Sequence, residues 1–337
     1  MMNRVARNLP SPNWDPPYPA WESTLPTDMQ SVICYIGCQG NPKQGDEFRR
    51  TISEQILRRH GDCHVEFARY SDRAGTLNTV GLVYWLHQSA FEKWRAEEVE
   101  ALLSNAGEKD GAGVWIENFP ILRKHVETLF SSDDQAPGIA KYSRGKVNIT
   151  RLHAYFGSMR DRLFSSNDSD HKSPVSQLSK KSKAVDGAGR VSVATPSQLC
   201  AIRSGQDWSH CGEEQRDYYL NELEPVLRKG MEFLSNNPVE TGCIACRYMT
   251  ETDDSGQPKD RTFGYALFRD IADLESWSKS HPTHLAIFRK FHEYTQAFNF
   301  EIELDLWHEV LVMPNPTTFT YVNCAPTTGL LPFFANH

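Results

Sequence analysis

A chain of 337 residues with 39% hydrophobic residues can bury a substantial core, and its length favours about two domains. The net charge of −7 gives no basic surface of the kind that binds nucleic acid. No run of about 18 apolar residues is present, which argues against a membrane-spanning helix. Eight cysteines in a chain of this length, without an apolar leader, indicate reduced thiols and a cytoplasmic protein.

The N-terminus is rich in proline and has no apolar stretch, so residues 1–29 are expected to form an extended arm and not a signal peptide. Further along, Cys34 and Cys38 form a C-x-x-x-C pair, and Cys243 and Cys246 form a C-x-x-C pair. Both pairs lie within apolar strand patterns. Small buried side chains explain them better than a zinc site does.

Hydrophobic periodicity predicts the same order of elements twice along the chain. In the first half these elements are the strand Val32–Cys38, the helix Asp46–His60, the strands Cys63–Tyr70 and Thr79–His87, the helix Ser89–Leu103 and the strand Gly113–Ile121. In the second half they are the strand Gln198–Gly205, the helix Glu213–Ser235, the strands Gly242–Thr250 and Thr262–Arg269, the helix Ile271–Phe298 and the strand Glu301–Met313. The order β-α-β-β-α-β is that of a ferredoxin-like unit.

Matching residues support an internal repeat. Gly81–Trp94 aligns without gaps on Gly264–Trp277, and Val32–Gly40 aligns on Gln198–Gln206. We therefore expect an α+β fold of tandem ferredoxin-like repeats, formed by residues 30–164 and 190–337. Their sheets should join into one α+β barrel with the helices outside. The polar, Ser- and Lys-rich residues 165–189 between them are expected to form a linker or mobile loop.

Two histidines fall where an apolar side chain is expected. The first, His284, lies on a helix that is expected to begin at the N-cap Ser280, with Pro282 in its first turn. On a helical wheel His284 lies in the middle of an apolar arc, and His281 and His292 lie at its edge. The residues that share this arc are Ile287, Phe288, Phe291, Thr295 and Phe298.

His308 is the second of these histidines. Period-two alternation places it on the inward face of its strand, together with Leu306 and Val310. In the repeat, Val114–Glu117 aligns on Leu306–Glu309, so that Ile116 takes the place of His308. For either histidine alone we favour a hydrogen-bonded core residue. For the pair, a binding site for something flat and apolar explains both at least as well.

Four further positions are less distinctive by themselves. Ser204 shares the inward parity of its apolar strand neighbours, so its hydroxyl must find a partner or bind a ligand atom, and a hydrogen-bonded buried serine is the simpler interpretation. Arg160 and Arg162 belong to a charged segment that is typical of a solvated surface. Glu127 lies among apolar residues and by itself resembles a surface acid of a helix.

Five motifs taken together resemble the haem-containing aldoxime dehydratases. They are GSMRDR (Gly157–Arg162), RSGQDW (Arg203–Trp208), SHPTHLAIF (Ser280–Phe288), LWHEV (Leu306–Val310) and YVNCAPTTGLLP (Tyr321–Pro332). The resemblance runs from about Val32 to the C-terminus, and the motifs follow the family's order. It implies a homodimer with a dimeric α+β barrel fold. It also implies the dehydration of an aldoxime, R–CH=N–OH, to a nitrile on a ferrous haem b.

The resemblance further implies roles for individual residues. His284 matches the proximal haem ligand, with His281 of the same motif as the alternative. His308 matches the distal residue that protonates the departing hydroxyl and then removes the C–H proton. Ser204 matches a serine that orients the oxime hydroxyl.

Arg162 and Glu127 match an arginine and a glutamate that support the distal histidine, although Arg160 in the same motif is an alternative to Arg162. An unidentified reductant is needed to keep the iron ferrous. The choice between aryl and alkyl aldoximes is left open by these motifs. Two other functions also remain open: another haem reaction on the same barrel, of the peroxidase or chlorite dismutase kind, and a haem-binding sensor without turnover.

Overall fold

The computed structural model describes residues 18–59, 62–106, 111–134, 136–150, 158–164, 171–181 and 189–335. In the first half its elements are β2 (Gln30–Gln39), α1 (Pro42–Leu57), β3 (Cys63–Ser71), β4 (Leu77–Trp85), α2 (Gln88–Trp94), the π-helical turn η1 (Arg95–Val99), α3 (Glu100–Ala106) and β5 (Gly113–Leu122). In the second half they are β9 (Leu199–Asp207), α5 (Glu213–Tyr218), η5 (Tyr219–Leu223), α6 (Glu224–Asn236), α7 (Pro238–Thr241), β10 (Cys243–Thr252), β11 (Pro258–Phe268), α8 (Ile271–Ser280), α9 (Pro282–Ala297) and β12 (Asp305–Met313). These positions confirm the predicted helices and strands to within a few residues at most ends.

Further elements were not predicted. They are β1 (Trp21–Ser23), η2 (Arg123–His125), β6 (Val126–Phe130), η3 (Gly138–Tyr142), β7 (Lys146–Asn148), α4 (Ser158–Arg162), β8 (Arg190–Ala194), β13 (Thr318–Val322) and α10 (Leu331–Phe334). In the described part of the chain all strands form one antiparallel sheet of thirteen, in the order β7-β1-β6-β12-β9-β11-β10-β3-β4-β2-β5-β13-β8.

The predicted fold class, tandem ferredoxin-like repeats closed into a dimeric α+β barrel, is wrong. The two halves share one open sheet, joined where Thr250–Thr252 of β10 pairs with Phe67–Arg69 of β3. Short strands extend the sheet beyond β12 at one end and beyond β5 at the other. β6 pairs with β12 and β13 pairs with β5, so the exposed edges pass to the three-residue β7 and the five-residue β8.

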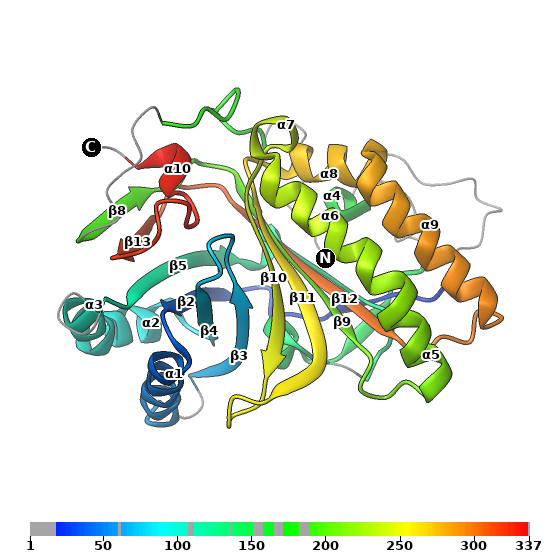
Figure 1. Cartoon of the computed structure of the whole chain (residues 1–337), viewed down its shortest axis with the longest axis horizontal. Coiled ribbons are helices and arrows are strands. Elements are labelled where there is room, and N and C mark those ends of the chain that lie inside the picture. The colour runs from blue at the N-terminus through cyan, green and yellow to red at the C-terminus, as the bar shows by residue number, and fades with distance from the viewer. Residues whose placement is uncertain are drawn as a thin grey trace.

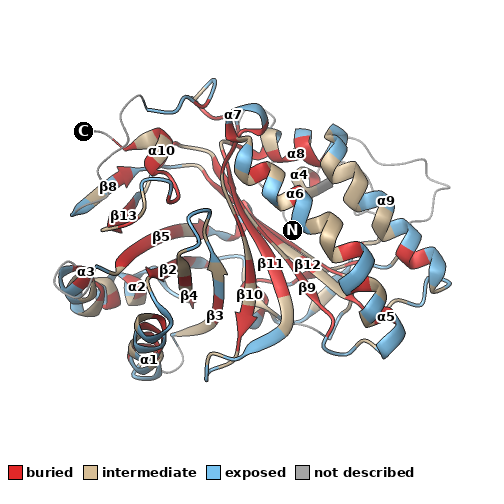
Figure 2. Ribbon diagram, viewed as in Figure 1, coloured by how far each residue is buried: buried red, intermediate tan, exposed pale blue. Residues whose placement is uncertain are grey.

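The helices cover the outer faces of the two halves (Figure 1). α1, α2 and α3 lie on the first half, whereas α6, α8 and α9 lie on the second. The opposite faces of both halves contribute to one main core, in which the rings of Tyr35 and Tyr265 stack with centroids 4.0 Å apart. Figure 2 shows the central strands largely buried and the solvent sides of α6 and α9 exposed. Leu178, from the predicted linker, is also buried in this core.

The predicted helix Ile271–Phe298 is divided at His281, which has extended backbone angles and caps α9. Pro282 explains the break, because proline has no N–H and disfavours a helical conformation in the residue before it. Nδ1 of His281 accepts a hydrogen bond from the N–H of Thr283. α9 is therefore entered through His281, and not through the predicted Ser280.

Two glycine–tryptophan contacts identify corresponding positions in the two halves. Gly37 lies opposite Trp115 and Gly205 lies opposite Trp307, and at either glycine a Cβ atom would overlap the indole ring. Ile36 therefore corresponds to Ser204, two residues from the alignment predicted for Val32–Gly40. The parity of the strand is unchanged by this shift.

Within the described ranges, no helix is both long and apolar enough to cross a bilayer.

Candidate active site

Ser204 and His308 lie directly opposite each other on β9 and β12. Because opposite residues of an antiparallel pair point to the same face, both side chains face the layer of helices over the second half. Val310, on the same face of β12, packs in a cluster that includes Ile287 of α9. The helix that carries His284 thus covers the face that carries Ser204 and His308.

Glu127 reaches this face from β6, where it lies opposite Val310 and diagonally from His308. The interpretation of Glu127 as a surface acid of a helix is wrong, since it is a strand residue with no exposed surface. Its Oε1 atom lies 2.7 Å from Nε2 of His308. Arg162, which is only 2% exposed, donates from Nε to Oε2 of Glu127 at 2.8 Å.

The two arginines of the charged segment have different partners. Nη2 of Arg162 lies 3.3 Å from both Oε1 of Glu127 and Nε2 of His308. Arg160 forms a two-pronged ion pair with Glu275 of α8, at 3.0 Å from Nε and 2.8 Å from Nη2. The structure therefore brings Arg162, and not Arg160, to His308.

The carboxylate of Glu127 stays ionised although it is buried. Burial would raise its pKa, but the positive charges of Arg162 and His308 lower it from 4.5 to about 2. An ionised carboxylate can only accept, so Nε2 of His308 donates and Nδ1 is the acceptor of the neutral ring. In the described residues, neither Nδ1 of His308 nor Oγ of Ser204 has a hydrogen-bond partner, so both atoms are available to a substrate.

His284 lies in the first turn of α9, with its ring packed edge-on against Trp277 at 4.6 Å between centroids. Burial lowers the pKa of His284 from 6.5 to about 4, so the imidazole is neutral at neutral pH. Its Nδ1 atom is buried and has no hydrogen-bond partner among the described residues. A neutral imidazole with an unsatisfied ring nitrogen fits a haem iron ligand.

The surroundings of His284 also suit a flat apolar cofactor. In α9 the fully buried residues are Tyr294 and Thr295, far from the first turn. Near His284 the helix presents apolar side chains that are only partly buried or exposed, namely Leu285, Ile287 and Phe288. Phe288, at 54% exposed, departs from the predicted arc.

The other two histidines of this region have different surroundings. His281 is the N-cap of α9, and its Nδ1 atom lies 2.8 Å from Oγ1 of Thr283. His292 is exposed and contacts Gln296 of the next turn at 3.3 Å. Neither ring has the unsatisfied buried nitrogen that distinguishes His284. All eight cysteines are free thiols, and the described residues contain no group of three or more His, Cys, Asp or Glu side chains arranged to bind a metal ion.

Sequence reasoning missed a set of buried charges behind the strands of this site, which includes Arg203 and Glu309. Alternation placed Glu309 on the face opposite His308 but gave no sign that this face is buried. One signal was present, since Trp-x-Glu occurs both at Trp115–Glu117 and at Trp307–Glu309.

Comparisons with known proteins identify the family of this chain. Residues 34–330 match the family model described as haem-containing dehydratase. The chain is 34% identical to phenylacetaldoxime dehydratase of Bacillus sp. (strain OxB-1), over 97% of this chain and 95% of the relative. It is 30% identical to aliphatic aldoxime dehydratase of Rhodococcus erythropolis, over 97% and 94%.

A solved structure supports the same relationship. The crystal structure of an aldoxime dehydratase in complex with butyraldoxime has a TM-score of 0.84 and 28% identity, and the match covers 98% of this chain and 92% of that one. The resemblance inferred from the five motifs is thereby confirmed. The chain belongs to the haem-containing dehydratase family.

Proposed function

We propose that the protein dehydrates aldoximes to nitriles, converting R–CH=N–OH to R–C≡N and water, on a ferrous haem b held by His284. The family description names both haem and dehydration. The relatives are named as phenylacetaldoxime and aliphatic aldoxime dehydratases. A bound haem, held by His284, would supply an iron that activates the N–O bond of the oxime.

The observation that carries the proposal is the arrangement of His308, Glu127, Arg162 and Ser204 on one face of the sheet. The oxime hydroxyl leaves more easily as water, so it must receive a proton. Protonated His308 donates that proton from Nδ1, while its Nε2–H remains bonded to Glu127. Oγ of Ser204, opposite His308, donates a hydrogen bond to the oxime oxygen and orients it.

The same imidazole completes the reaction. After the hydroxyl has left, Nδ1 of His308 is an unprotonated acceptor, and it removes the proton from the aldoxime C–H group. This step forms the nitrile and restores the protonated imidazole, so protons balance over one turnover. Glu127 holds the ring in one orientation throughout, and Arg162 holds Glu127.

We further infer that the protein is a cytoplasmic homodimer that needs an electron donor to keep its iron ferrous. Eight free thiols support a reducing compartment. The dimer and the electron donor follow from the family resemblance.

A spectroscopic experiment tests this function. The purified, haem-loaded and reduced protein is mixed with phenylacetaldoxime under nitrogen, and the Soret band and nitrile formation are followed together. We expect the band to shift on mixing and to return as nitrile accumulates. A Soret band that does not shift when the aldoxime is added, with no nitrile formed, would contradict the proposal and favour a peroxidase or a haem sensor. Failure to take up haem would contradict the role of His284.

A further inference from the structure

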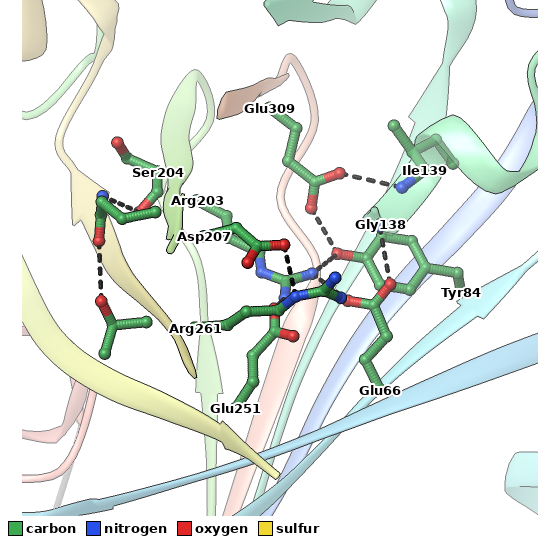
Figure 3. A network of polar contacts seen from close by, with 12 residues as sticks. Glu66, Tyr84, Gly138, Ile139, Arg203, Ser204, Asp207, Glu251, Arg261 and Glu309 are labelled. Atoms are coloured by element: carbon green, nitrogen blue, oxygen red, sulfur yellow. Dashed lines mark hydrogen bonds and ion pairs between the residues drawn. The ribbon is translucent and has the colours of Figure 1, made fainter. Parts of the chain in front are cut away.

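Arg203 and Glu309 lie opposite each other on β9 and β12, next in sequence to Ser204 and His308. Because successive strand residues point to opposite faces, Arg203 and Glu309 face the main core, behind the active-site pair. Both are almost fully buried, at 1% and 2% exposed. A buried cation and a buried carboxylate need several polar partners, and Figure 3 shows how they obtain them.

Arg203 uses both of its terminal nitrogens. Nη1 donates to Oε2 of Glu66 at 2.6 Å and to the hydroxyl of Tyr84 at 2.8 Å. Nη2 donates to Oε1 of Glu251 at 2.8 Å. The guanidinium also lies over the ring of Trp307, 4.7 Å from its centroid. β9 is thereby linked to β3 and β4 of the first half as well as to β10.

Glu309 extends the same network towards the segment that follows β6. Its Oε1 atom accepts from the hydroxyl of Tyr84 at 2.5 Å, and its Oε2 atom accepts from the N–H of Ile139 at 3.1 Å. Glu66 accepts from the neighbouring N–H of Gly138 at 2.8 Å. One cluster therefore fixes both strands of the Ser204–His308 pair and contacts the chain soon after the strand that carries Glu127.

Arg203 binds the carboxylates of Glu66 and Glu251 directly and is linked to that of Glu309 through the hydroxyl of Tyr84. Burial opposes ionisation of all of them. The charge of Arg203 nevertheless holds the pKa of Glu66 well below its usual range, whereas burial raises the pKa values of Glu251 and Glu309. Removing Arg203 would leave buried carboxylates without their counter-charge. The stability of the cluster therefore depends on the guanidinium of Arg203.

Glu117 of β5 and Arg247 of β10 form a similar cluster in a different context. Arg247 binds Glu117 through two hydrogen bonds of 2.6 and 2.7 Å and lies 4.3 Å from the ring centroid of Trp115. Glu117 follows Ile116, which lies opposite Ile36. The two clusters thus share their chemistry and their burial, but the Glu117 cluster lies behind an apolar pair and the Arg203 cluster behind Ser204 and His308.

We propose that Arg203 and Glu309 are positioning residues of the dehydratase. They fix the β9 and β12 backbones so that Oγ of Ser204 and Nδ1 of His308 both reach the oxime oxygen. This inference rests on the proposed function. A misplacement of about 1 Å in such an arrangement can cost roughly a hundredfold in rate.

The test compares Arg203→Lys with the matched control Arg247→Lys in the haem-loaded protein. We expect Arg203→Lys to lower kcat for phenylacetaldoxime by at least roughly tenfold, with little change in KM or in haem content. Arg247→Lys should lower the melting temperature to a similar extent and leave kcat within about twofold of wild type. Glu309→Gln is the milder second variant, should Arg203→Lys fail to fold, and it should lower kcat in the same direction.

Three outcomes overturn the inference. An unchanged kcat in Arg203→Lys or in a folded Glu309→Gln would show that the cluster does not position the site. An equal loss of kcat in Arg247→Lys would show a general effect of destabilisation. Both of these outcomes leave the proposed function intact, because the wild type still turns over. Absence of nitrile formation by the wild-type protein would overturn the proposed function, and this inference with it.

Discussion

Glu127 and His308 are joined by a hydrogen bond of 2.7 Å between residues from neighbouring strands, and the same carboxylate binds Arg162 at 2.8 Å. The carboxylate has no exposed surface. It can therefore exchange neither partner for water. The contact with Glu127 fixes the orientation of the His308 ring, and Nδ1 of His308 has no hydrogen-bond partner among the described residues.

Substitutions of His284 and His281 should have different effects, the first on haem binding and the second on the capping of α9. We expect His284→Ala to abolish haem binding, because it removes the neutral imidazole with the unsatisfied nitrogen. His281→Ala removes the N-cap of α9 and should cost about 1 kcal/mol of stability while haem is retained. The haem content per protein, from the pyridine haemochrome spectrum, measures the difference. Haem loss in His281→Ala alone would reverse the assignment.

His308→Ala should retain haem and lose turnover. Removal of a group that both donates and accepts the reacting proton is expected to lower kcat by roughly 10²–10⁴-fold. The Soret shift on mixing with aldoxime should persist, since binding of the oxime nitrogen does not need His308. Stopped-flow spectra together with nitrile analysis check both parts. A variant that forms nitrile at the wild-type rate would exclude His308 as the acid–base residue.

Arg162 and Arg160 provide a matched pair of substitutions. Arg162→Ala leaves Glu127 buried beside His308 without its second partner, and we expect a loss of about 3–5 kcal/mol in stability together with reduced kcat. Arg160→Ala breaks a pair with Glu275 that retains some solvent contact and should cost about 1 kcal/mol or less, with kcat unchanged. Urea unfolding and steady-state kinetics distinguish the two. A larger loss of stability and of kcat in Arg160→Ala than in Arg162→Ala would place Arg160 at the site.

Glu127 should make stability depend on acid pH. Its native pKa of about 2 lies below the ordinary value of 4.5, so the ionised group contributes stability that is complete above about pH 4.5 and is lost as pH falls towards 2. Glu127→Gln has no such group, and its unfolding free energy should fall less steeply over that interval. Urea titrations at several pH values, with wild type as the reference, measure the slopes. Parallel slopes would show that the Glu127 carboxylate is not stabilised by its partners.

The parts of the structure with a strong period could be predicted from sequence, and the short parts could not. β11 and α6 are long and patterned, whereas β1, β6 and β7 have three to five residues, too few to show alternation. These short strands lie at one end of the sheet, beyond β12. The barrel was expected from the internal repeat and the family resemblance, and the short strands that extend the sheet were not part of that prediction.

Some residues of the site could likewise be selected from the sequence, and others could not. His284, His308 and Ser204 could be selected because their parity or wheel position conflicts with their polarity. Glu127 had no such signal, because its strand was not recognised, and its place beside His308 depends on the pairing of β6 with β12. The roles assigned to these residues came from the family resemblance and remain predictions.

The pairing of β6 with β12 also distinguishes the two halves of the chain. The first half has corresponding glycine, tryptophan and glutamate positions, with Ile36 and Ile116 where the second has Ser204 and His308, but the arginine that binds its glutamate is Arg247 of β10. The flanking strand of the first half, β13, has the sequence TFTYV and supplies no carboxylate. Two substitutions would reproduce the polar pair there, but not the buried acid that orients it. The two halves thus share these glycine and tryptophan positions, and the flanking strand β6 with its Glu127 carboxylate distinguishes the half that carries Ser204 and His308.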